Sequence, residues 1–205
     1  ATVNVKSGKA SFEKYIKDEN DSSTEDVNEW QGSADYDIND KVPFQLKANL
    51  PSNYDSYKYY QLIFHDDLNK KSGTPAVDVF GNPEEIVVYV DLNKNGKSDA
   101  DEILTKDTDY TVTIHETDKT ENETFDCDFE VTISNLVGKK EGISSTTPVY
   151  VEYKAELLSA AVLGNPGNWN DGYLEYSNNP NVEANGAGDS KSETPVESAV
   201  AFTYQ

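Results

Sequence analysis

The sequence predicts an all-β fold, an immunoglobulin-like antiparallel β-sandwich of about nine or ten strands. Apolar and polar residues alternate with a period of two along most of the chain, and stretches rich in Asn, Asp, Gly and Pro separate the alternating runs. No long segment repeats its apolar residues at the helical period of about 3.6. With 205 residues and no internal repeat, the chain is long enough to bury a core of its own.

The alternating runs give the strands in their order along the chain. In the first run Phe12 and Ile16 share one face, and in the next run Val42, Phe44 and Leu46 do the same. The runs lie at residues 9–20, 41–50, 57–66, 84–91, 109–116, 125–134, 149–158, 172–178 and 198–204.

The segments between the runs set the domain organisation. Residues 1–10 are predicted to be an extended linker from a preceding domain, and residues 11–205 a single domain. Two polar stretches, 18–40 and 178–198, are predicted to be long surface loops because they are rich in acidic, Asn and Gly residues.

The composition excludes several functional classes. The formal net charge is −21, and all 17 basic residues are lysine, so we expect no nucleic-acid partner. No run reaches the roughly 18 apolar residues that a membrane span needs, so this fragment is expected to have no membrane partner. The single cysteine cannot form an internal disulfide, and the many Tyr, Thr, Asn and Asp residues favour an extracellular β-protein.

In three of the alternating runs, the face that carries the apolar residues, and is therefore predicted to point inward, also carries one polar residue. These residues are Lys14, Asp66 and Asn178. An unpaired charge in a core costs several kcal/mol, so each of the three needs a partner. Lys14 and Asp66 as an ordinary ion pair, or a register slip that turns Lys14 to solvent, would satisfy this requirement without further chemistry.

The same trio also supports a covalent reaction. Burial disfavours the ammonium form of lysine, and a neutral amine is a nucleophile. A buried carboxyl group stays protonated and can donate to the amide oxygen of asparagine, which stabilises the oxyanion formed by amine attack. Loss of ammonia would leave a Lys–Asn isopeptide bond, a single-turnover reaction without a cofactor. We therefore expect no enzyme activity on an external substrate.

The chain resembles a known family in four segments. They read "SGKASFEKYIKD", "DINDKVPFQLKANLPSNYDSYKYYQLIFHDDL", "VYVEYKAELLSAAVLGNPGNWNDGYLEYSNNPN" and "TPVESAVAFTY". Together they resemble the isopeptide-forming (D2-type) domain of Gram-positive fimbrial backbone pilins and cell-wall surface adhesins. The resemblance covers nearly the whole chain in order, with the central region most divergent, and it implies a CnaA-type sandwich.

The resemblance implies roles for the three inward residues. The first-strand lysine of the family bonds an asparagine at the end of the penultimate strand, with help from an acidic residue on a middle strand. The matching residues here are Lys14, Asn178 and Asp66. If a bulge shifts a register, the alternatives are Lys17 for the lysine, Asn179 for the asparagine and Asp67 for the acid.

The resemblance also implies a location and partners. The expected function is that of a structural module in a surface pilus or adhesin, extracellular and anchored to the cell wall, with neighbouring domains or subunits of the fibre as partners. The sequence carries no LPxTG-like sortase signal and no recognisable pilin-motif lysine. The parts that polymerise and anchor such a protein would therefore lie outside these residues.

The stretch "DLNKNGKSDADE" matches the template of a calcium-binding loop. Gly96 would make the sharp turn that brings the two ends of the loop together around Ca²⁺. The oxygen ligands would come from Asp91, Asn93, Asn95, the backbone carbonyl of Lys97, Asp99 and Glu102. Because Asn-Gly is also a favoured hairpin turn, a plain turn is the alternative.

The remaining chemistry-bearing residues give weaker signals. His65 and His115, the two histidines, lie on different predicted strands and face outward, so neither a zinc site nor a His-based triad is expected. Cys127 is interpreted as a small strand residue. Trp30 and Trp169 are predicted to lie in loops, where they could stack on sugars. The alternative function is therefore a calcium-dependent carbohydrate- or matrix-binding adhesin domain, with a host glycan or matrix protein as partner.

Overall fold

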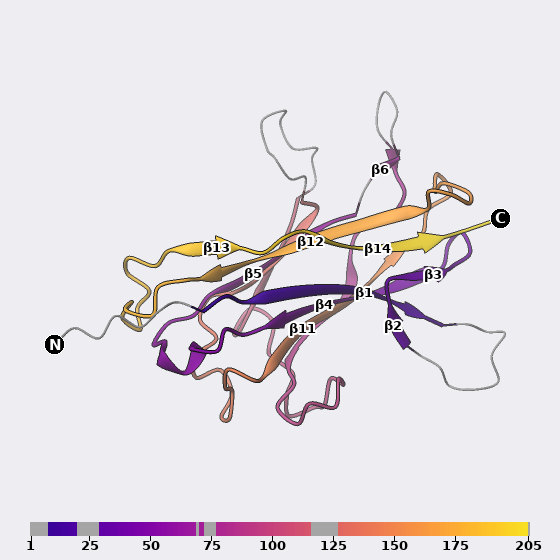
Figure 1. Ribbon diagram of the computed structural model, residues 1–205. Coiled ribbons are helices and arrows are strands. Elements are labelled where there is room, and N and C mark those ends of the chain that lie inside the picture. Colours follow the sequence, from indigo (N-terminus) through magenta and orange to yellow (C-terminus); the bar gives the residue numbers. More distant parts are fainter. Residues whose placement is uncertain (1–7, 20–28, 69, 72–76, 116–126, 205) are drawn as a thin grey trace.

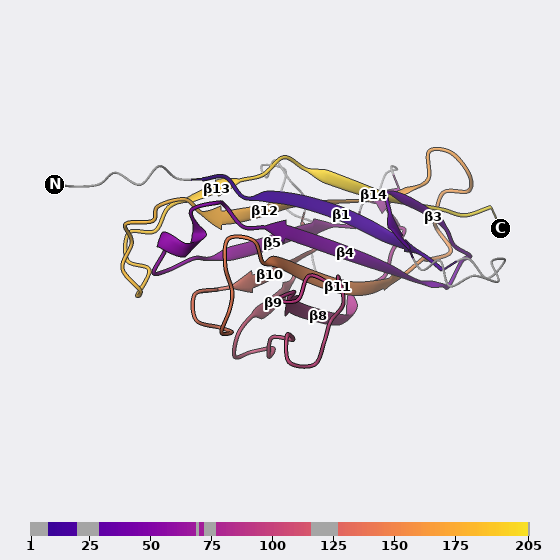
Figure 2. The same ribbon diagram turned by 60° about the horizontal axis from the view of Figure 1, so that its bottom comes forward.

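The chain folds into two packed β-sheets, seen from two directions in Figures 1 and 2. The computed structural model describes residues 8–19, 29–68, 70–71, 77–115 and 127–204. The strands of these residues are β1 (Ser11–Asp18), β2 (Glu29–Gln31), β3 (Ser33–Asp35), β4 (Lys41–Asn49), β5 (Leu62–Asp67), β6 (Lys70–Lys71), β7 (Val77–Asp78), β8 (Glu84–Val90), β9 (Thr111–Ile114), β10 (Phe129–Ile133), β11 (Pro148–Glu156), β12 (Asn168–Ser177), β13 (Lys191–Glu193) and β14 (Glu197–Phe202), with a 3₁₀ turn at Tyr54–Ser56.

The strand order confirms the predicted immunoglobulin-like sandwich. One sheet has the order β2-β1-β4-β11-β8, and the other has the order β3-β14-β12-β5-β10-β9, with β13 beside β12. The pairs are antiparallel except β14 with β3, and β6 pairs with β7 apart from both sheets. Each of the nine predicted runs overlaps one of the longer strands, although β5, β11, β12 and β14 extend beyond the predicted bounds.

The two predicted loops contain short strands that the sequence does not reveal. The stretch 18–40 holds β2 and β3, and the stretch 178–198 holds β13. Each is three residues long, too short for alternation to show, and lies among polar residues. Residues 20–28 of the first stretch and residues 1–7 of the predicted linker lie outside the described residues.

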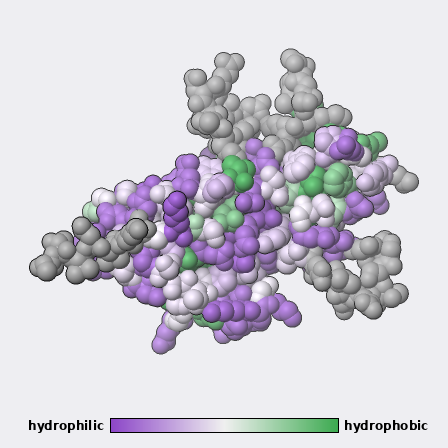
Figure 3. All heavy atoms as spheres, in the orientation of Figure 1, coloured by the Kyte–Doolittle hydropathy of each residue, from purple (hydrophilic) through white to green (hydrophobic). Residues whose placement is uncertain are grey.

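The core lies between the two sheets. Alternate residues of β4 are fully buried because they face the second sheet, and Phe44 stacks on Tyr153 of the neighbouring β11. The outside is mainly hydrophilic with scattered apolar patches on the face shown in Figure 3, as the acidic composition predicts. The part of the chain that the structure describes has no helix able to cross a membrane.

The strands β1, β5 and β12 position the candidate site. The inward row of β5 contains Leu62, Phe64 and Asp66, all fully buried, while His65 lies on the opposite face of the sheet. β12 pairs with β5 so that Gly172 is opposite Asp66. β1 belongs to the first sheet and packs against β12 and β14 of the second. Lys14 therefore meets Asp66 across the sandwich.

Candidate functional site

The predicted pairing of Lys14 with Asp66 is present in the core. Lys14 is 4% exposed and Asp66 is fully buried, and Lys14 Nζ donates to Asp66 Oδ2 in a buried ion pair. Lys14 Nζ also lies 3.4 Å from the carbonyl oxygen of Asp171 on β12. The register of β1 with β4 runs without a shift from Ser11 to Ile16, so Lys14 is the inward lysine of this strand.

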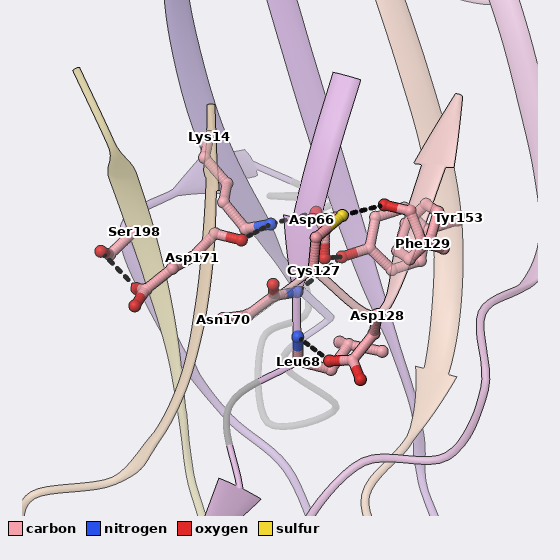
Figure 4. A network of polar contacts seen from close by, with 10 residues as sticks. All are labelled: Lys14, Asp66, Leu68, Cys127, Asp128, Phe129, Tyr153, Asn170, Asp171 and Ser198. Atoms are coloured by element: carbon pink, nitrogen blue, oxygen red, sulfur yellow. Dashed lines mark hydrogen bonds and ion pairs between the residues drawn. The ribbon is translucent and has the colours of Figure 1, made fainter. Parts of the chain in front are cut away.

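Two further side chains extend this pair into a network. The hydroxyl of Tyr153, on β11, donates to Asp66 Oδ1 at 2.8 Å. Asn170, on β12, donates from Nδ2 to the Tyr153 oxygen at 2.6 Å. Asn170 is fully buried, and its Oδ1 has no hydrogen-bond partner among the described residues. Figure 4 shows the four side chains pointing toward one another between the sheets.

A glycine on β12 makes room for the lysine. A Cβ atom at Gly172 would lie 2.9 Å from the carbonyl oxygen of His65, 3.3 Å from the Phe12 ring and 3.4 Å from Lys14 Nζ. The contact with the His65 carbonyl would force the backbone of β5 or β12 to move, and the Phe12 ring would also be crowded. The absence of a side chain at this position therefore lets β12 lie close to β5 beneath Phe12 and Lys14.

The apolar surroundings change the protonation of the pair. Burial lowers the pKa of Lys14 below its ordinary value, although the carboxylate of Asp66 opposes this shift. Burial likewise raises the pKa of Asp66, against the opposing influence of Lys14. The aromatic rings of Phe44 and Tyr153 lie 5.8 and 6.0 Å from Lys14 Nζ. Both shifts favour a neutral amine beside a neutral carboxyl group.

The predicted asparagine, Asn178, is not part of this network. Asn178 lies beyond the end of β12, where its Nδ2 donates to Ser192 and its Oδ1 accepts from Ser190. Gly172 is the residue opposite Asp66, and six residues of strand separate it from Asn178, a distance of about 20 Å. Asn179 is farther still, and its Oδ1 accepts from the backbone of Asn181.

Lys17 and Asp67 also lie away from the buried pair. Lys17 is on the outer face of β1 and forms a half-exposed ion pair with Glu19. Asp67 is on the outer face of β5, directly after the buried Asp66. The asparagine that the fold brings to Lys14 and Asp66 is therefore Asn170.

A signal for Asn170 exists in the sequence. β12 begins at Asn168, four residues before the predicted strand, and its buried row continues backward through Gly172 to Asn170. The composition of the stretch "GNWND" predicts a loop, because Gly, Asn and Asp are typical of turns. When the alternation of "GYLEYS" is extended two residues backward from Gly172, it places Asn170 on the inward face.

The predicted calcium loop has a tightly bonded backbone. The buried carboxylate of Asp91 accepts from the backbone N–H of Asn95 at 3.0 Å and from that of Gly96 at 2.9 Å. Gly96 has a φ of 71°, a conformation that favours glycine. Because these bonds fold the first half of the loop around Asp91, the loop is more ordered than a simple two-residue turn.

The second half of the loop closes back on the first. Glu102 is 2% exposed; its Oε1 accepts from the backbone of Asn93, while its Oε2 is buried without a hydrogen-bond partner among the described residues. Asp99 Oδ2 accepts from the side-chain amides of Asn93 and Asn95 at 2.7 and 2.8 Å. Asp91, Asp99 and Glu102 do not place three ligand atoms within 4.8 Å of one another. A bound cation would have to draw Asp99 and the amide oxygens inward.

The predicted loop tryptophans lie on strands instead. Trp30 is on β2 opposite Lys17 of β1, and Trp169 is on β12 opposite Val200 of β14. Trp169 is 43% exposed, and its indole N–H donates to the carbonyl of Pro166. Sugar stacking on these rings stays a prediction.

The histidines and the cysteine lie closer together than the sequence predicts. His65 does face outward from β5, but it is only 7% exposed, and Cys127 lies just before β10 and is 1% exposed. His65 and Cys127 lie within reach of a common carboxylate, Glu130. Alternation along single strands could not reveal this proximity, because it arises from the pairing of β5 with β10.

Comparisons with known proteins support the fold. Neither the protein-family models nor the sequences of curated proteins give a match. A C-terminal fragment of the major pilin GBS80 of Streptococcus agalactiae is similar in structure, with 15% identity, a TM-score of 0.56, and coverage of 96% of this chain and 56% of that one. The major pilin subunit BcpA of Bacillus cereus has 11% identity and a TM-score of 0.53, covering 95% of this chain and 40% of that one.

A third solved structure agrees with these two. The pilus backbone protein RrgB of Streptococcus pneumoniae has 15% identity and a TM-score of 0.51, with coverage of 84% of this chain and 54% of that one. The chain thus spans about half the length of the pilin structures that it resembles, between 40% and 56%. It has the fold of the domains of Gram-positive major pilins.

Proposed function

We propose that the chain is a structural module of a bacterial surface fibre, with an internal isopeptide bond between Lys14 and Asn170. The observation that carries this proposal is the buried network of Lys14, Asp66, Tyr153 and Asn170 between the sheets. The pilin-like fold supports the same function. In such a fibre the neighbouring domains or subunits are its partners, and the location is the outer surface of the cell.

The reaction that we propose balances without a cofactor. The neutral Lys14 amine attacks Cγ of Asn170, and the proton of Asp66 passes to Oδ1, an oxygen left without a hydrogen-bond partner among the described residues. The bond from Cγ to Nδ2 then breaks, and the nitrogen leaves as ammonia with a proton that the lysine amine gives up. The carboxyl group of Asp66 is regenerated, so each molecule reacts once.

The positions of the two ends give the bond a mechanical role. Lys14 is on β1 of one sheet and Asn170 is on β12 of the other, so the bond would join the two sheets through the core. It would close a loop containing most of the domain, and by analogy with long disulfide loops this stabilises by about 5 kcal/mol. A force that separates the sheets would then act on a covalent bond.

Intact-mass spectrometry tests the proposal. The wild-type chain is expected to be lighter than its sequence by one ammonia, and Asn170→Ala and Lys14→Ala should each abolish this loss. Asn178→Ala is the matched control, because the Asn178 side chain bonds to Ser190 and Ser192, away from Lys14, and its loss should leave the mass loss intact. A wild-type mass equal to that of the unmodified sequence would leave an ordinary buried ion pair and refute the crosslink.

We further propose that the loop from Asp91 to Glu102 binds Ca²⁺ as a structural ion. The residues of this loop are suited to Ca²⁺ for two reasons. The buried Glu102 Oε2 lacks a hydrogen-bond partner among the described residues, and carboxylate and amide oxygens are ligands that Ca²⁺ prefers. The ion would lower the repulsion between Asp91, Asp99 and Glu102 and fix the connection after β8.

Binding of Ca²⁺ should raise the thermal midpoint of unfolding. At a calcium concentration 100-fold above Kd the folded state gains about 2.7 kcal/mol, which should raise the midpoint by roughly 5–11 °C for a chain of this size. Glu102→Gln should remove this response. Asp101→Asn is the matched control, because Asp101 is exposed and occupies a position of the template that supplies no ligand. If neither calcium nor a chelator changes the midpoint, the loop does not bind Ca²⁺ and is a plain turn.

A further inference from the structure

A cluster of metal-ligand side chains lies on the outer face of the second sheet. The chain has two histidines and one cysteine, and all three lie around the carboxylate of Glu130. Ligand atoms of His65, Cys127 and Glu130 lie within 4.8 Å of one another, and within the described ranges no other His, Cys, Asp or Glu trio does so. His115 Nε2 is 3.7 Å from Glu130 Oε1.

Strand pairing brings these residues together. Glu130 on β10 is directly opposite His65 on β5, so their side chains leave the sheet on the same face. His115 follows the last residue of β9, and its N–H donates to the carbonyl of Asp128, which continues the pairing of β9 with β10. Cys127 lies just before β10. Two neighbouring strands, β5 and β10, and the residues next to the ends of β9 and β10 thus supply the four side chains.

The central histidine is held in one orientation. Its ring stacks on Tyr173 of β12, with the ring centroids 4.3 Å apart and the planes 1° from parallel. His65 Nδ1 is 3.1 Å from Glu130 Oε1, and its Nε2 is 3.6 Å from Glu175 Oε2. A histidine bound to a metal commonly offers its second ring nitrogen to a carboxylate, and Glu175 lies where such a partner is needed.

We propose that this cluster is a binding site for a divalent transition metal of the zinc class, with His65, His115, Cys127 and Glu130 as ligands. Two nitrogens, one sulfur and one oxygen form a ligand set typical of tetrahedral Zn²⁺. In such a site neighbouring ligand atoms are about 3.4 Å apart, and the contacts of Glu130 with His65 and His115 are 3.1 and 3.7 Å.

The charges of the proposed ligands match the ion. The carboxylate of Glu130 and the thiolate of Cys127 carry two negative charges, and the two imidazoles are neutral when they bind a metal. The thiol now donates to the carbonyl of Phe129 at 2.9 Å, as Figure 4 shows. On binding, that proton would leave to solvent and the sulfur would turn to the metal. The ion would join β5, β9 and the start of β10 on the outer face.

This site is independent of the isopeptide bond and of the calcium loop. Harder ions such as Ca²⁺ prefer ligand sets made only of oxygen, so the nitrogen and sulfur ligands separate the two metal sites by chemistry. A variant that cannot form the isopeptide bond should therefore still bind the transition metal.

Titration of the full chain with Co²⁺ after chelator treatment tests the proposal. A cobalt ion bound by Cys127 gives a thiolate-to-cobalt absorption band in the near ultraviolet, and the band should saturate at one ion per chain. Added Zn²⁺ should displace the cobalt and abolish the band. We expect Cys127→Ser to lose the band and His115→Gln to weaken binding by at least about 100-fold, more than loss of an outer carboxylate would.

Two controls keep the outcome interpretable. Glu102→Gln in the calcium loop should keep the band, and so should Glu183→Gln on the exposed surface. His115 is a third exposed, so His115→Gln should unfold like the wild type in metal-free buffer. The proposal is overturned if the wild type gives no thiolate band, or if binding is unchanged in both Cys127→Ser and His115→Gln.

Discussion

Two consecutive residues of β5 belong to two different polar clusters. Asp66 points into the sandwich and pairs with Lys14, while His65 points out of the same sheet and meets Glu130. The inner cluster is closed, with Lys14 4% exposed and Asp66 fully buried. The outer cluster has an open rim, because the side chains of Glu130 and His115 are 27% and 31% exposed. The two faces of one strand therefore carry a polar site shielded from solvent and a polar site that is partly exposed to solvent.

The difference between the two clusters lies in what water can reach. Inside the sandwich no solvent screens the charges, so burial shifts the pKa values of Lys14 and Asp66 toward their neutral forms and makes amine chemistry accessible. On the outer face, solvent at the rim lets a thiol proton and a metal ion enter and leave. We infer that the inner site suits one irreversible reaction and the outer site suits reversible binding.

The largest expected effect comes from breaking the inner cluster with Lys14→Met. This variant cannot form the isopeptide bond, which removes about 5 kcal/mol of stabilisation. It also leaves Asp66 buried without the lysine that opposes the rise of its pKa. Chemical denaturation should show a free energy of unfolding lower than that of the wild type at every pH.

The pH dependence of this variant has a definite sign. Because the folded-state pKa of Asp66 is raised, the folded chain holds this proton more tightly than the unfolded chain does. The resulting stabilisation is complete below the unfolded pKa of about 3.9 and is lost as the pH rises through the folded pKa, by about 1.4 kcal/mol for each pH unit between the two values. Lys14→Met should therefore be more stable at about pH 5 than at about pH 8.

The double variant Lys14→Met with Asp66→Asn is the control for that prediction. It also lacks the crosslink, but position 66 no longer titrates. The difference in stability between the single and the double variant should change with pH as described. If that difference is the same at both pH values, Asp66 does not have a raised pKa.

A smaller effect is expected from Tyr153→Phe, which leaves both reacting residues in place. The Tyr153 hydroxyl joins Asp66 to Asn170 through bonds of 2.8 and 2.6 Å, so it positions the amide for attack. Its loss should slow formation of the isopeptide bond roughly tenfold, equivalent to about 1.4 kcal/mol in the barrier. Mass spectra of freshly folded protein over time would show the fraction that has lost ammonia.

Tyr60→Phe is the matched control for this variant. Tyr60 is also fully buried in the core, but its hydroxyl has no hydrogen-bond partner among the described residues. Removing that hydroxyl should leave the rate of ammonia loss unchanged. Equal rates in Tyr153→Phe and the wild type would show that the tyrosine has no part in positioning Asn170.

The sequence predicts the inner cluster better than the outer one for a physical reason. A buried lysine or aspartate stands out in a row of apolar residues, because burial of a charge is costly and therefore rare. Lys14 and Asp66 are identifiable in this way. Asn170 is harder to identify, because the start of β12 has the composition of a turn although the alternation of the strand extends back to it and β14 pairs with this part of β12.

The outer cluster is not predictable from single strands. Polar residues on a solvent face are ordinary, so His65, Glu130 and His115 give no local signal. Their proximity depends on the order β5-β10-β9 and on the register of these strands. The longer strands and the two-sheet architecture follow from alternation, whereas the strand order and the short strands β2, β3 and β13 require the tertiary structure.

The smallest expected effect tests whether the two clusters are independent, although they share β5. Glu130→Gln keeps the size and the outward position of the side chain and removes one proposed metal ligand. The Glu130 side chain is 27% exposed and contacts His65, so the free energy of unfolding in metal-free buffer should change by about 1 kcal/mol or less. The mass loss of one ammonia should be complete, because Lys14 and Asn170 lie on the other side of the sheet. Cobalt binding should be weakened in the same sample.

If Glu130→Gln instead reduced the extent of the isopeptide bond, the outer residues would help to hold Asp66 in place, and the two faces of β5 would form one coupled site.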